Sequence, residues 1–337
     1  MNSTPLSSHP RDVLLGAQAV RGLLPVCDHY SGVPARMVKS LQLQAELMKE
    51  FGVCVLDVTL DCEDGAPTGS EIEQAKTVAT LANSAYSATN NIAKPRIGAR
   101  LHAVDHPAFA SDIEIVVGQA ASSLAYIMIP KVESAADVAI AAAAMDAMDA
   151  MGSRLPLHVL IESPAAVHRA FEIAAHPRVE SISFGLMDFV SAHAGAIPHT
   201  AMGMEQFQHP LVIRAKLEIA SACHAYGKVP SHCVVTELQD ASIIERAAHT
   251  AATSLGYTRM WSIHPHQIRP ILRAFMPSIE EVELAQKVIQ KAHSENWAPI
   301  AFNGKLHDRA SYRYFWQVLE RAHQTGCTLP ESVQTYF

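Results

Sequence analysis

Apolar residues gather in eight short runs along the chain. The runs are GLLPVCD, VCVLDVTLD, PRIGARLHA, SLAYIMIPK, PLHVLIES, SISFGLMDF, KVPSHCVV and RMWSIHP. Segments with helical periodicity lie between most of them, and Met37, Leu41, Ala45 and Met48 fall on one face of the first. Strand and helix alternating eight times is the pattern of a (β/α)8 TIM barrel, in the α/β class. A doubly wound open sheet is the alternative, but no G-x-G-x-x-G follows the first run.

The chain continues beyond the eighth run. PSIEEVELAQKVIQKA predicts a helix that starts with a capping box at Ser278. FNGK then predicts a turn, and a final helical segment follows. We therefore assign residues 1–293 to the barrel and 294–337 to a C-terminal helical extension, which caps the barrel or reaches a neighbouring subunit.

Composition narrows the class of partner. The 337 residues carry 26 Lys+Arg against 33 Asp+Glu, a net charge of −7, and form no basic stripe, which argues against nucleic acid. No run approaches the length of a membrane span, and the first residues lack the pattern of a signal peptide. The six cysteines include no C-x-x-C pair, as expected of a reduced cytoplasmic protein. We expect a small-molecule substrate.

Polar residues end most of the apolar runs. In a barrel of this kind the chemistry lies at the carboxyl ends of the strands, where all these side chains converge. Each residue alone is ordinary strand-end polarity, and His264 is expected to be structural. Their convergence favours a site. The residues concerned are Asp61, Glu63, Asp64, Arg100, Lys131, Glu133, Glu162, Asp188 and His264.

Glu162 and Asp188 are the candidate metal ligands. Asp188 lies between Met187 and Phe189, where we expect a buried carboxylate that is costly unless a cation holds it. Adjacent strands lie about 4.8 Å apart, close enough for the two carboxylates to share one hard cation. Mg²⁺ takes one or two carboxylates together with waters and substrate oxygens. Zinc is less favoured, because the sequence has no clustered set of His and Cys ligands. A salt bridge to Lys131 or Arg100 is the alternative reading.

Seven motifs, in order, resemble those of the citrate lyase beta-subunit family. They are LDCEDG, ARLHAVDHP, MIPKVESAADV, LIESPAAV, SFGLMDF, LGYTRMWSIHPHQI and FNGKLHD. The resemblance extends from about residue 21 to residue 322, nearly the whole chain. Members of the family are Mg²⁺-dependent (β/α)8 barrels, with Mn²⁺ as an alternative ion, that cleave or form a carbon–carbon bond next to a thioester. They usually assemble as homotrimers or larger oligomers.

The resemblance implies roles for individual residues. Glu162 and Asp188 become metal ligands, and Arg100 becomes the cation facing the substrate. Asp308 becomes the acid/base from the C-terminal segment. Glu63 and Asp64 become acids that hold metal-bound waters.

Departures from the family pattern concern the substrate. Cys62 replaces the usual leucine between the acids, His102 stands where asparagine is common, and Arg259 lies where glycine and lysine are normal. The candidate substrate-binding residues are Lys131, His102, Arg36 and Lys39, of which Arg36 and Lys39 are candidates for contacting the phosphates of CoA.

A Claisen-type cleavage needs a metal to hold the hydroxy acid, a fixed cation for the developing charge and a mobile acid/base. The leading hypothesis is therefore a lyase acting on a 3-hydroxyacyl-CoA of the malyl, citramalyl or citryl type. The alternatives are a metal-dependent aldolase on a free 2-keto acid, a thioesterase and a catalytically silent scaffold subunit. The retained set of acids and arginine argues against the scaffold.

Overall fold

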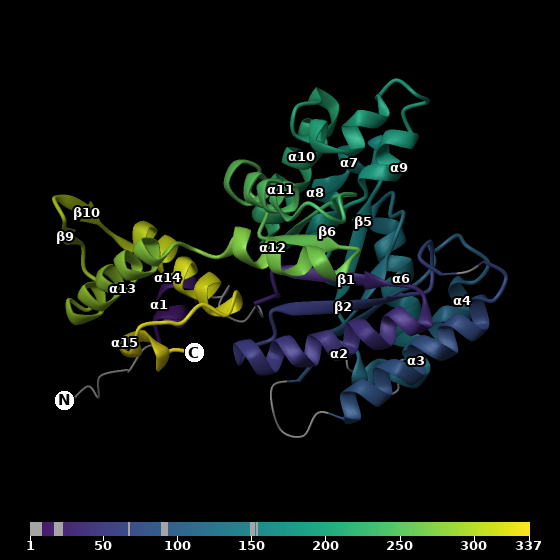
Figure 1. The fold of residues 1–337 in the computed structure, drawn as a ribbon, viewed down its shortest axis with the longest axis horizontal. Helices are drawn as coiled ribbons and strands as arrows, with labels where there is room; N and C mark the ends of the chain where they lie inside the picture. The colour runs from purple at the N-terminus through teal and green to yellow at the C-terminus, as the bar shows by residue number, and fades with distance from the viewer. Residues whose placement is uncertain (1–8, 17–22, 67, 89–93, 149–151, 153) are drawn as a thin grey trace. The chain divides into compact units, whose positions relative to one another are not determined.

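Eight parallel strands close into a barrel in a computed structural model that describes residues 9–16, 23–66, 68–88, 94–148, 152 and 154–337 (Figure 1). The strands follow one another around the barrel in sequence order, and β1 pairs with β8 to close it. This confirms the predicted (β/α)8 class. The strands are β1 (Cys27–Ser31), β2 (Leu56–Asp61), β3 (Ile97–Arg100), β4 (Tyr126–Ile129), β5 (Leu157–Ile161), β6 (Val179–Phe184), β7 (Val229–His232) and β8 (Arg259–Ser262).

Helices cover the outside of these strands, which explains why the strands read as continuous apolar runs rather than as alternating ones. Apart from the partly buried Glu180 and Val229, the strand residues are buried on both faces, one covered by the barrel interior and one by the helices. The longer helices are α2 (Pro34–Phe51), α3 (Glu71–Ser87), α6 (Ala135–Met148), α10 (Pro210–Tyr226), α11 (Ala241–Ser254) and α12 (Pro265–Phe275). Shorter helical segments are α4 (Phe109–Asp112), η2 (Ile113–Val117), α5 (Gly118–Ala120), η3 (Ala121–Ser123), α7 (Pro164–His168), α8 (Ala170–Ala175), α9 (Leu186–Ser191), η4 (His199–Met202) and η5 (Met204–Phe207).

The buried face of α2 only partly matches the apolar spacing of the sequence. Met37 and Met48 are buried as expected, but Ala45 is exposed and Gln44 is buried beside it. The Gln44 side-chain amide donates to the carbonyl oxygens of Leu56 and Arg96 at 2.7 and 2.8 Å. A polar residue therefore joins α2 to the barrel, because its two donors are satisfied where the strands begin.

Buried ion pairs occupy the amino-terminal half of the barrel. Arg259, at the start of β8, is fully buried and lies 3.0 Å from Asp28 of β1 and 2.8 Å from Asp57 of β2. Arg96 pairs with Asp57 from outside the strands at 3.0 Å. The arginine that departs from the family pattern therefore points into the barrel interior, at the end opposite the expected site.

A second compact unit contains the described residues before Pro25 and those after Phe275. Its elements are α1 (Pro10–Leu15), α13 (Ile279–Ser294), β9 (Ile300–Phe302), β10 (Lys305–His307), α14 (Arg309–Gln324) and α15 (Glu331–Gln334). Helix α13 begins with the predicted capping box at Ser278, and Asn303 and Gly304 form the predicted turn between β9 and β10.

Helix α13 belongs with this second unit, and not with the barrel, to which residues 1–293 were assigned from the sequence. Its apolar side chains Val282 and Ile289 share a core with Trp316 and Leu319 of α14. The N-terminal helix α1 packs against α14 as well (Figure 1). The boundary between the two units therefore lies after Phe275. None of the described helices combines the length and apolar character that crossing a membrane requires.

Candidate active site

Charged residues meet at the carboxyl ends of β2 to β5. Asp61 and Arg100 are the last residues of β2 and β3, and the strand register places them side by side. Glu162 follows directly after β5, and Lys131 lies two residues after β4. The convergence expected from the barrel pattern is therefore present for these four side chains.

Arg100 is held by two carboxylates. Its Nε donates to Asp61 Oδ1 at 2.7 Å, its Nη2 donates to Asp61 Oδ2 at 2.5 Å, and its Nη1 lies 2.9 Å from Glu63 Oε2. Burial would lower the pKa of Arg100, but the charges of Asp61 and Glu63 raise the pKa above its usual value. The guanidinium is thus a fixed cation, and the ion pairs use only part of its five N–H groups.

The loop after β2 holds Asp61 in place. Asp61 accepts hydrogen bonds from the backbone N–H groups of Glu63 at 3.0 Å and Gly65 at 2.9 Å. A Cβ on residue 65 would lie 3.2 Å from the Asp61 carboxyl carbon and closer still to Oδ2, so this approach requires glycine. The backbone of the CEDG segment therefore orients the carboxylate that orients Arg100.

Glu162 is buried, and two features of the backbone position it. Its Oε2 accepts from the N–H of Lys131 at 2.8 Å, and Lys131 has the left-handed φ of 52°. A Cβ on Gly185 would lie 2.7 Å from the Glu162 carboxyl carbon and closer to Oε1, so the side chain fits only against a glycine. Burial first, and then the charge of Asp188, raises the pKa of Glu162 to about 7.

Asp188 is not the buried acid that the sequence suggested. Strand β6 ends at Phe184, and Asp188 lies in the first turn of helix α9, where its side chain is exposed. Its apolar neighbour Phe189 turns inward because the helical period replaces strand alternation. Asp188 nevertheless lies close enough for its charge to raise the pKa of Glu162.

The donor set fits a hard divalent cation. Neither Lys131 nor Arg100 pairs with Glu162 or Asp188 through its side chain among the described ion pairs: Lys131 Nζ pairs with Glu63 and Asp64, and Arg100 with Asp61 and Glu63. The salt-bridge alternative therefore does not explain the pair. Within the described residues no group of three or more His, Cys, Asp or Glu side chains is arranged to hold a metal ion alone. A cation here would need waters or substrate oxygens to complete its coordination, as Mg²⁺ does.

Acids outnumber cations at this end of the barrel, which further favours a bound cation. The acids are Asp61, Glu63, Asp64, Glu162 and Asp188, and the cations are Arg100 and Lys131.

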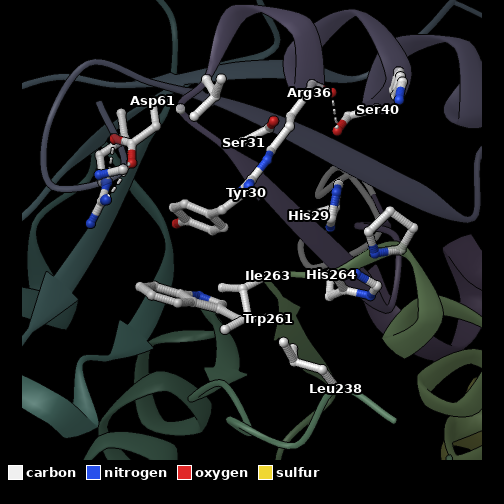
Figure 2. Close-up of a pocket in the computed structure, with 16 residues that line it drawn as sticks. His29, Tyr30, Ser31, Arg36, Ser40, Asp61, Leu238, Trp261, Ile263 and His264 are labelled. Atoms are coloured by element: carbon white, nitrogen blue, oxygen red, sulfur yellow. Dashed lines mark hydrogen bonds and ion pairs between the residues drawn. The ribbon is translucent and has the colours of Figure 1, made fainter. Parts of the chain in front are cut away.

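A cavity of about 730 Å³ lies on the Arg100 side of the charged cluster. Arg36 and Lys39 of α2 line it together with Asp61 and Arg100. Figure 2 shows Arg36 and Asp61 on its wall, with the rings of Tyr30 and Trp261 next to each other; the ring centroids lie 4.4 Å apart and the ring planes are tilted by 30°. His264 also lines this cavity, with its Nδ1 accepting from the N–H of His266 at 3.3 Å.

A second cavity, of about 390 Å³, lies on the Lys131 side of the cluster. Glu63, Asp64 and Lys131 line it together with His102 and His106. His102 is held by Asp112, which accepts from its backbone N–H at 2.9 Å and lies 2.7 Å from its Nδ1. The candidate substrate-binding residues thus divide between the two cavities, with the charged cluster between them.

Asp308 belongs to the second unit, where it caps a helix. Its Oδ1 accepts from the N–H groups of Ala310 at 2.9 Å and Ser311 at 3.3 Å, and the side chain is exposed at the start of α14. Capping uses only part of the carboxylate's capacity to accept hydrogen bonds. The acid/base role implied by the resemblance therefore stays a prediction.

Three residues of the site were missed as functional positions in the sequence. Asp61 was noted as a strand-end acid but not as the partner of Arg100, and neither Gly185 nor Asp112 was singled out. A glycine inside the SISFGLMDF run was the available signal for a close approach. Asp112 gave no signal, because its partner His102 lies ten residues away across a loop.

Comparisons with known proteins show what the whole chain is similar to. Residues 40–265 match the model of the HpcH/HpaI aldolase/citrate lyase family. The L-malyl-CoA/beta-methylmalyl-CoA lyase of Rhodobacter capsulatus is 27% identical over 285 residues, which cover 79% of this chain and 86% of the relative.

Two solved structures extend the comparison to the fold. A citrate lyase from Burkholderia xenovorans LB400 is 45% identical, with a TM-score of 0.81 over 98% of this chain and 100% of that one. The CitE protein of Mycobacterium tuberculosis, solved with magnesium, acetoacetate and coenzyme A, is 22% identical. Its TM-score is 0.66 over 88% of this chain and 98% of that one, a likeness of fold.

Proposed function

The chain belongs to the HpcH/HpaI aldolase/citrate lyase family, and from this premise we propose that it is a Mg²⁺-dependent carbon–carbon lyase that cleaves or forms a 3-hydroxyacyl thioester. The observation that supports this most is the combination of Glu162, Asp188 and a fixed Arg100 at one end of the barrel. The malyl-CoA lyase relative has the same type of reaction in its name.

Glu162 and Asp188 would hold the Mg²⁺, with Mn²⁺ as the alternative ion, and Glu63 and Asp64 would accept hydrogen bonds from its waters. When bound, the ion would hold the hydroxy acid and make its hydroxyl group more acidic. Without a cation, the pKa of the buried Glu162 carboxyl is about 7. A bound divalent ion would stabilise its ionised form.

Arg100 would stabilise the negative charge that develops on oxygen during the cleavage. Because Asp61 and Glu63 fix the guanidinium, little reorganisation is needed at the moment of reaction. The N–H groups not used in those pairs remain for a carboxylate or carbonyl oxygen of the substrate. Lys131 positions two acids. Its side chain pairs with Glu63, and its backbone N–H donates to Glu162.

The 730 Å³ cavity favours a coenzyme A thioester over a free keto acid. Arg36 and Lys39 are exposed side chains on its wall, and they would contact the phosphate groups of a long carrier while Arg100 faces the thioester end. A free 2-keto acid would need neither residue. We place the reaction in the cytoplasm, as the cysteine pattern of the sequence suggested.

Asp308 would supply or remove the proton at the enolate carbon. We propose that the enzyme is a homo-oligomer, a trimer or larger, in which the C-terminal segment of one subunit brings Asp308 to the barrel of the next. Gly304, with a φ of 72°, and the exposed side chains Leu306 and Tyr314 give this segment a tight turn and apolar surface.

A product assay tests the proposal. Malyl-, methylmalyl-, citramalyl- and citryl-CoA are each incubated with the enzyme and Mg²⁺, with and without a chelator, and the keto acid and thioester products are measured separately. A lyase forms a keto acid and a shortened acyl-CoA in equal amounts. Free CoA thiol without keto acid would indicate a thioesterase, turnover of free keto acids alone would indicate an aldolase, and no turnover would indicate a scaffold.

A further inference from the structure

Two histidines form a stacked pair on the wall of the 390 Å³ cavity. The rings of His102 and His106 lie 4.3 Å apart, with an angle of 13° between their planes. His102 follows β3, the strand that ends with Arg100, and His106 lies in the loop beyond it. The pair is thus attached to the same strand end as the proposed catalytic arginine.

Each ring is fixed through its Nδ1. The His102 Nδ1 lies 2.7 Å from the fully buried Asp112, which requires a proton on that nitrogen. The His106 Nδ1 accepts from the backbone N–H of Ala108 at 3.1 Å, which leaves the proton on Nε2. Within the described residues no partner is found for either Nε2, so these atoms remain for a ligand.

The charges around the cavity favour a cationic His102. The hydrogen bond that His102 donates to Asp112 raises the pKa of His102, burial acts against it, and the charges of Asp112, Glu63 and Glu71 raise it further. The acids on the wall already have partners: Glu63 pairs with Arg100 and Lys131, Asp64 pairs with Lys131, and Glu71 accepts from the N–H of Gly69 at 2.8 Å. Asp105 lies at the exposed rim.

We propose that His102 and His106 form a carboxylate-binding subsite, which selects 3-hydroxyacyl thioesters that carry a second free carboxylate on the acyl chain. This inference rests on the proposed lyase function, because the cavity shares Glu63 and Lys131 with the catalytic cluster. The acyl end would enter this cavity, while the phosphates of the carrier lie in the larger cavity beside Arg36 and Lys39. A charged imidazole and a neutral N–H donor fit one carboxylate better than a methyl group.

Citryl-CoA and citramalyl-CoA are the matched probes, because they differ only by a carboxylate on one methyl group. The wild-type enzyme should have the higher kcat/KM for citryl-CoA. His102→Asn should lower that value by about 10- to 100-fold, the effect of one charge-assisted hydrogen bond, and leave citramalyl-CoA within about twofold. His106→Asn should act in the same direction with a smaller effect. His249→Asn, at an exposed position of α11, is the control and should change neither value.

The pH dependence separates a binding role from a structural one. The raised pKa of His102 means that its charge persists through the usual range of a histidine and is lost as pH rises further. The preference for citryl-CoA should therefore fall as pH rises, and His102→Asn should make the preference independent of pH. Asp112→Asn should shift the fall to lower pH, because the ring then loses its anionic partner.

Direct binding distinguishes failure of this inference from failure of the proposed function. In protein with ¹⁵N-labelled histidine rings, oxaloacetate should shift the His102 resonances, whereas pyruvate, which lacks the second carboxylate, should leave them unchanged. If no thioester is cleaved but the shift occurs, the lyase function is wrong and the subsite stands. If citryl- and citramalyl-CoA are cleaved equally well, or His102→Asn lowers both alike, or oxaloacetate shifts neither ring, the subsite is wrong.

Discussion

At the scale of single residues, the site consists of charges that hold one another. Arg100 keeps its place through Asp61 and Glu63, and Glu63 in turn pairs with Lys131. The chain of ion pairs fixes side chains that would otherwise have many rotamers, which lowers the cost of ordering them at the moment of reaction. Glu162 stands apart, because its contact with this chain is the backbone N–H of Lys131.

Replacing Arg100 with lysine should reduce turnover far more than stability. Lysine keeps the charge but loses the planar fork that spans both oxygens of Asp61 and also reaches Glu63. We expect kcat/KM to fall by about 100-fold or more, with a small change in Tm. Steady-state assays and thermal melts of the same samples measure the two effects.

The control for this substitution is Arg269→Lys. Arg269 also makes a two-pronged contact with one carboxylate, donating from Nη1 and Nη2 to Glu50 at 2.9 and 2.6 Å, but on the exposed surface. That variant should leave turnover unchanged. A loss of less than about twofold in Arg100→Lys would exclude a charge-stabilising role for Arg100.

Glu162 gives the metal-free protein a dependence on pH. Its pKa is raised from 4.5 to about 7, so the native state keeps a proton that the unfolded chain releases. Stability should therefore fall as pH rises from about 4.5 to about 7, by an amount on the order of 3 kcal/mol, and then level off. Mg²⁺ needs the ionised form, so its affinity should rise over the same interval.

Thermal melts and Mg²⁺ titrations of the wild type and Glu162→Gln across that interval provide the measurement. Glutamine keeps the shape but cannot ionise, so the difference between the two proteins isolates this carboxylate. If the difference in Tm stays constant with pH in metal-free buffer, Glu162 is not protonated in the native state.

At the scale of elements, the ends of two neighbouring strands differ in kind. Strand β5 passes directly into Glu162, whereas β6 ends at Phe184 and a glycine precedes the short helix α9 that holds Asp188. The hydrogen bond from the Gly185 N–H to the Ile161 carbonyl, at 2.9 Å, continues the strand pairing just to the point where Glu162 lies. Gly185 therefore leaves space for the Glu162 carboxylate, and the helix that begins after it carries Asp188.

Substituting Gly185 with alanine should displace Glu162. The added Cβ would lie within 2.7 Å of the Glu162 carboxyl carbon, but the φ of −87° at this position suits alanine, so the backbone is not strained. We expect Mg²⁺ affinity to fall by about tenfold or more and stability to fall by about 1–3 kcal/mol. Calorimetric titration with Mg²⁺ and denaturant unfolding measure both.

Gly118→Ala is the matched substitution away from the site, because a Cβ there would meet only the end of the Met148 side chain, at 3.6 Å. It should leave Mg²⁺ binding unchanged. Unaltered Mg²⁺ affinity in Gly185→Ala would mean that Glu162 can bind the ion from another rotamer.

At the scale of the whole molecule, the proposed chemistry needs residues from both compact units. The barrel unit holds Arg100, Glu162 and Asp188, and the second unit holds Asp308 at the start of α14. The second unit has a core of its own, in which Trp316 and Tyr312 are fully buried. It can therefore present Asp308 on a stable surface, as a segment that serves a neighbouring subunit must.

Mixing inactive variants tests whether Asp308 acts between subunits. Asp308→Ser removes the carboxylate but keeps a side chain that caps α14, so its folding should be normal. Mixed oligomers of Asp308→Ser and Glu162→Gln subunits should regain part of the activity, since some sites then combine an intact barrel with an intact C-terminal segment. Turnover is measured after the variants are dissociated together and reassembled.

Each variant reassembled alone is the control and should stay inactive. Mixed oligomers that form, as shown by two differently tagged subunits eluting together, yet remain inactive would rule out action in trans. Full activity of Asp308→Ser by itself would rule out any acid/base role for this residue.

The sequence by itself determined the barrel and most of the charged residues that meet at the carboxyl ends of its strands. Strands buried on both faces are mostly apolar, so the eight runs were visible along the chain and all eight strands lie within or overlap them, although β1 and β2 also carry the buried acids Asp28 and Asp57. The strand ends must be polar, and this identified Arg100, Lys131 and Glu162. Features formed by residues close together in the sequence were also predicted correctly, as for the helix cap at Ser278 and the turn at Asn303 and Gly304.

The tertiary structure decided which residues meet. Arg100 pairs with Asp61 because β2 and β3 are adjacent in register, a contact between residues 39 positions apart that no local pattern encodes. The chain around Asp188 reads as a strand, but the chain leaves the barrel after Phe184, so the acid is exposed on a helix. Burial of Gln44 and Arg259 likewise depends on partners supplied by distant strands. Apolar periodicity records how much of each segment is buried, whereas the choice of partner is made only when the barrel closes.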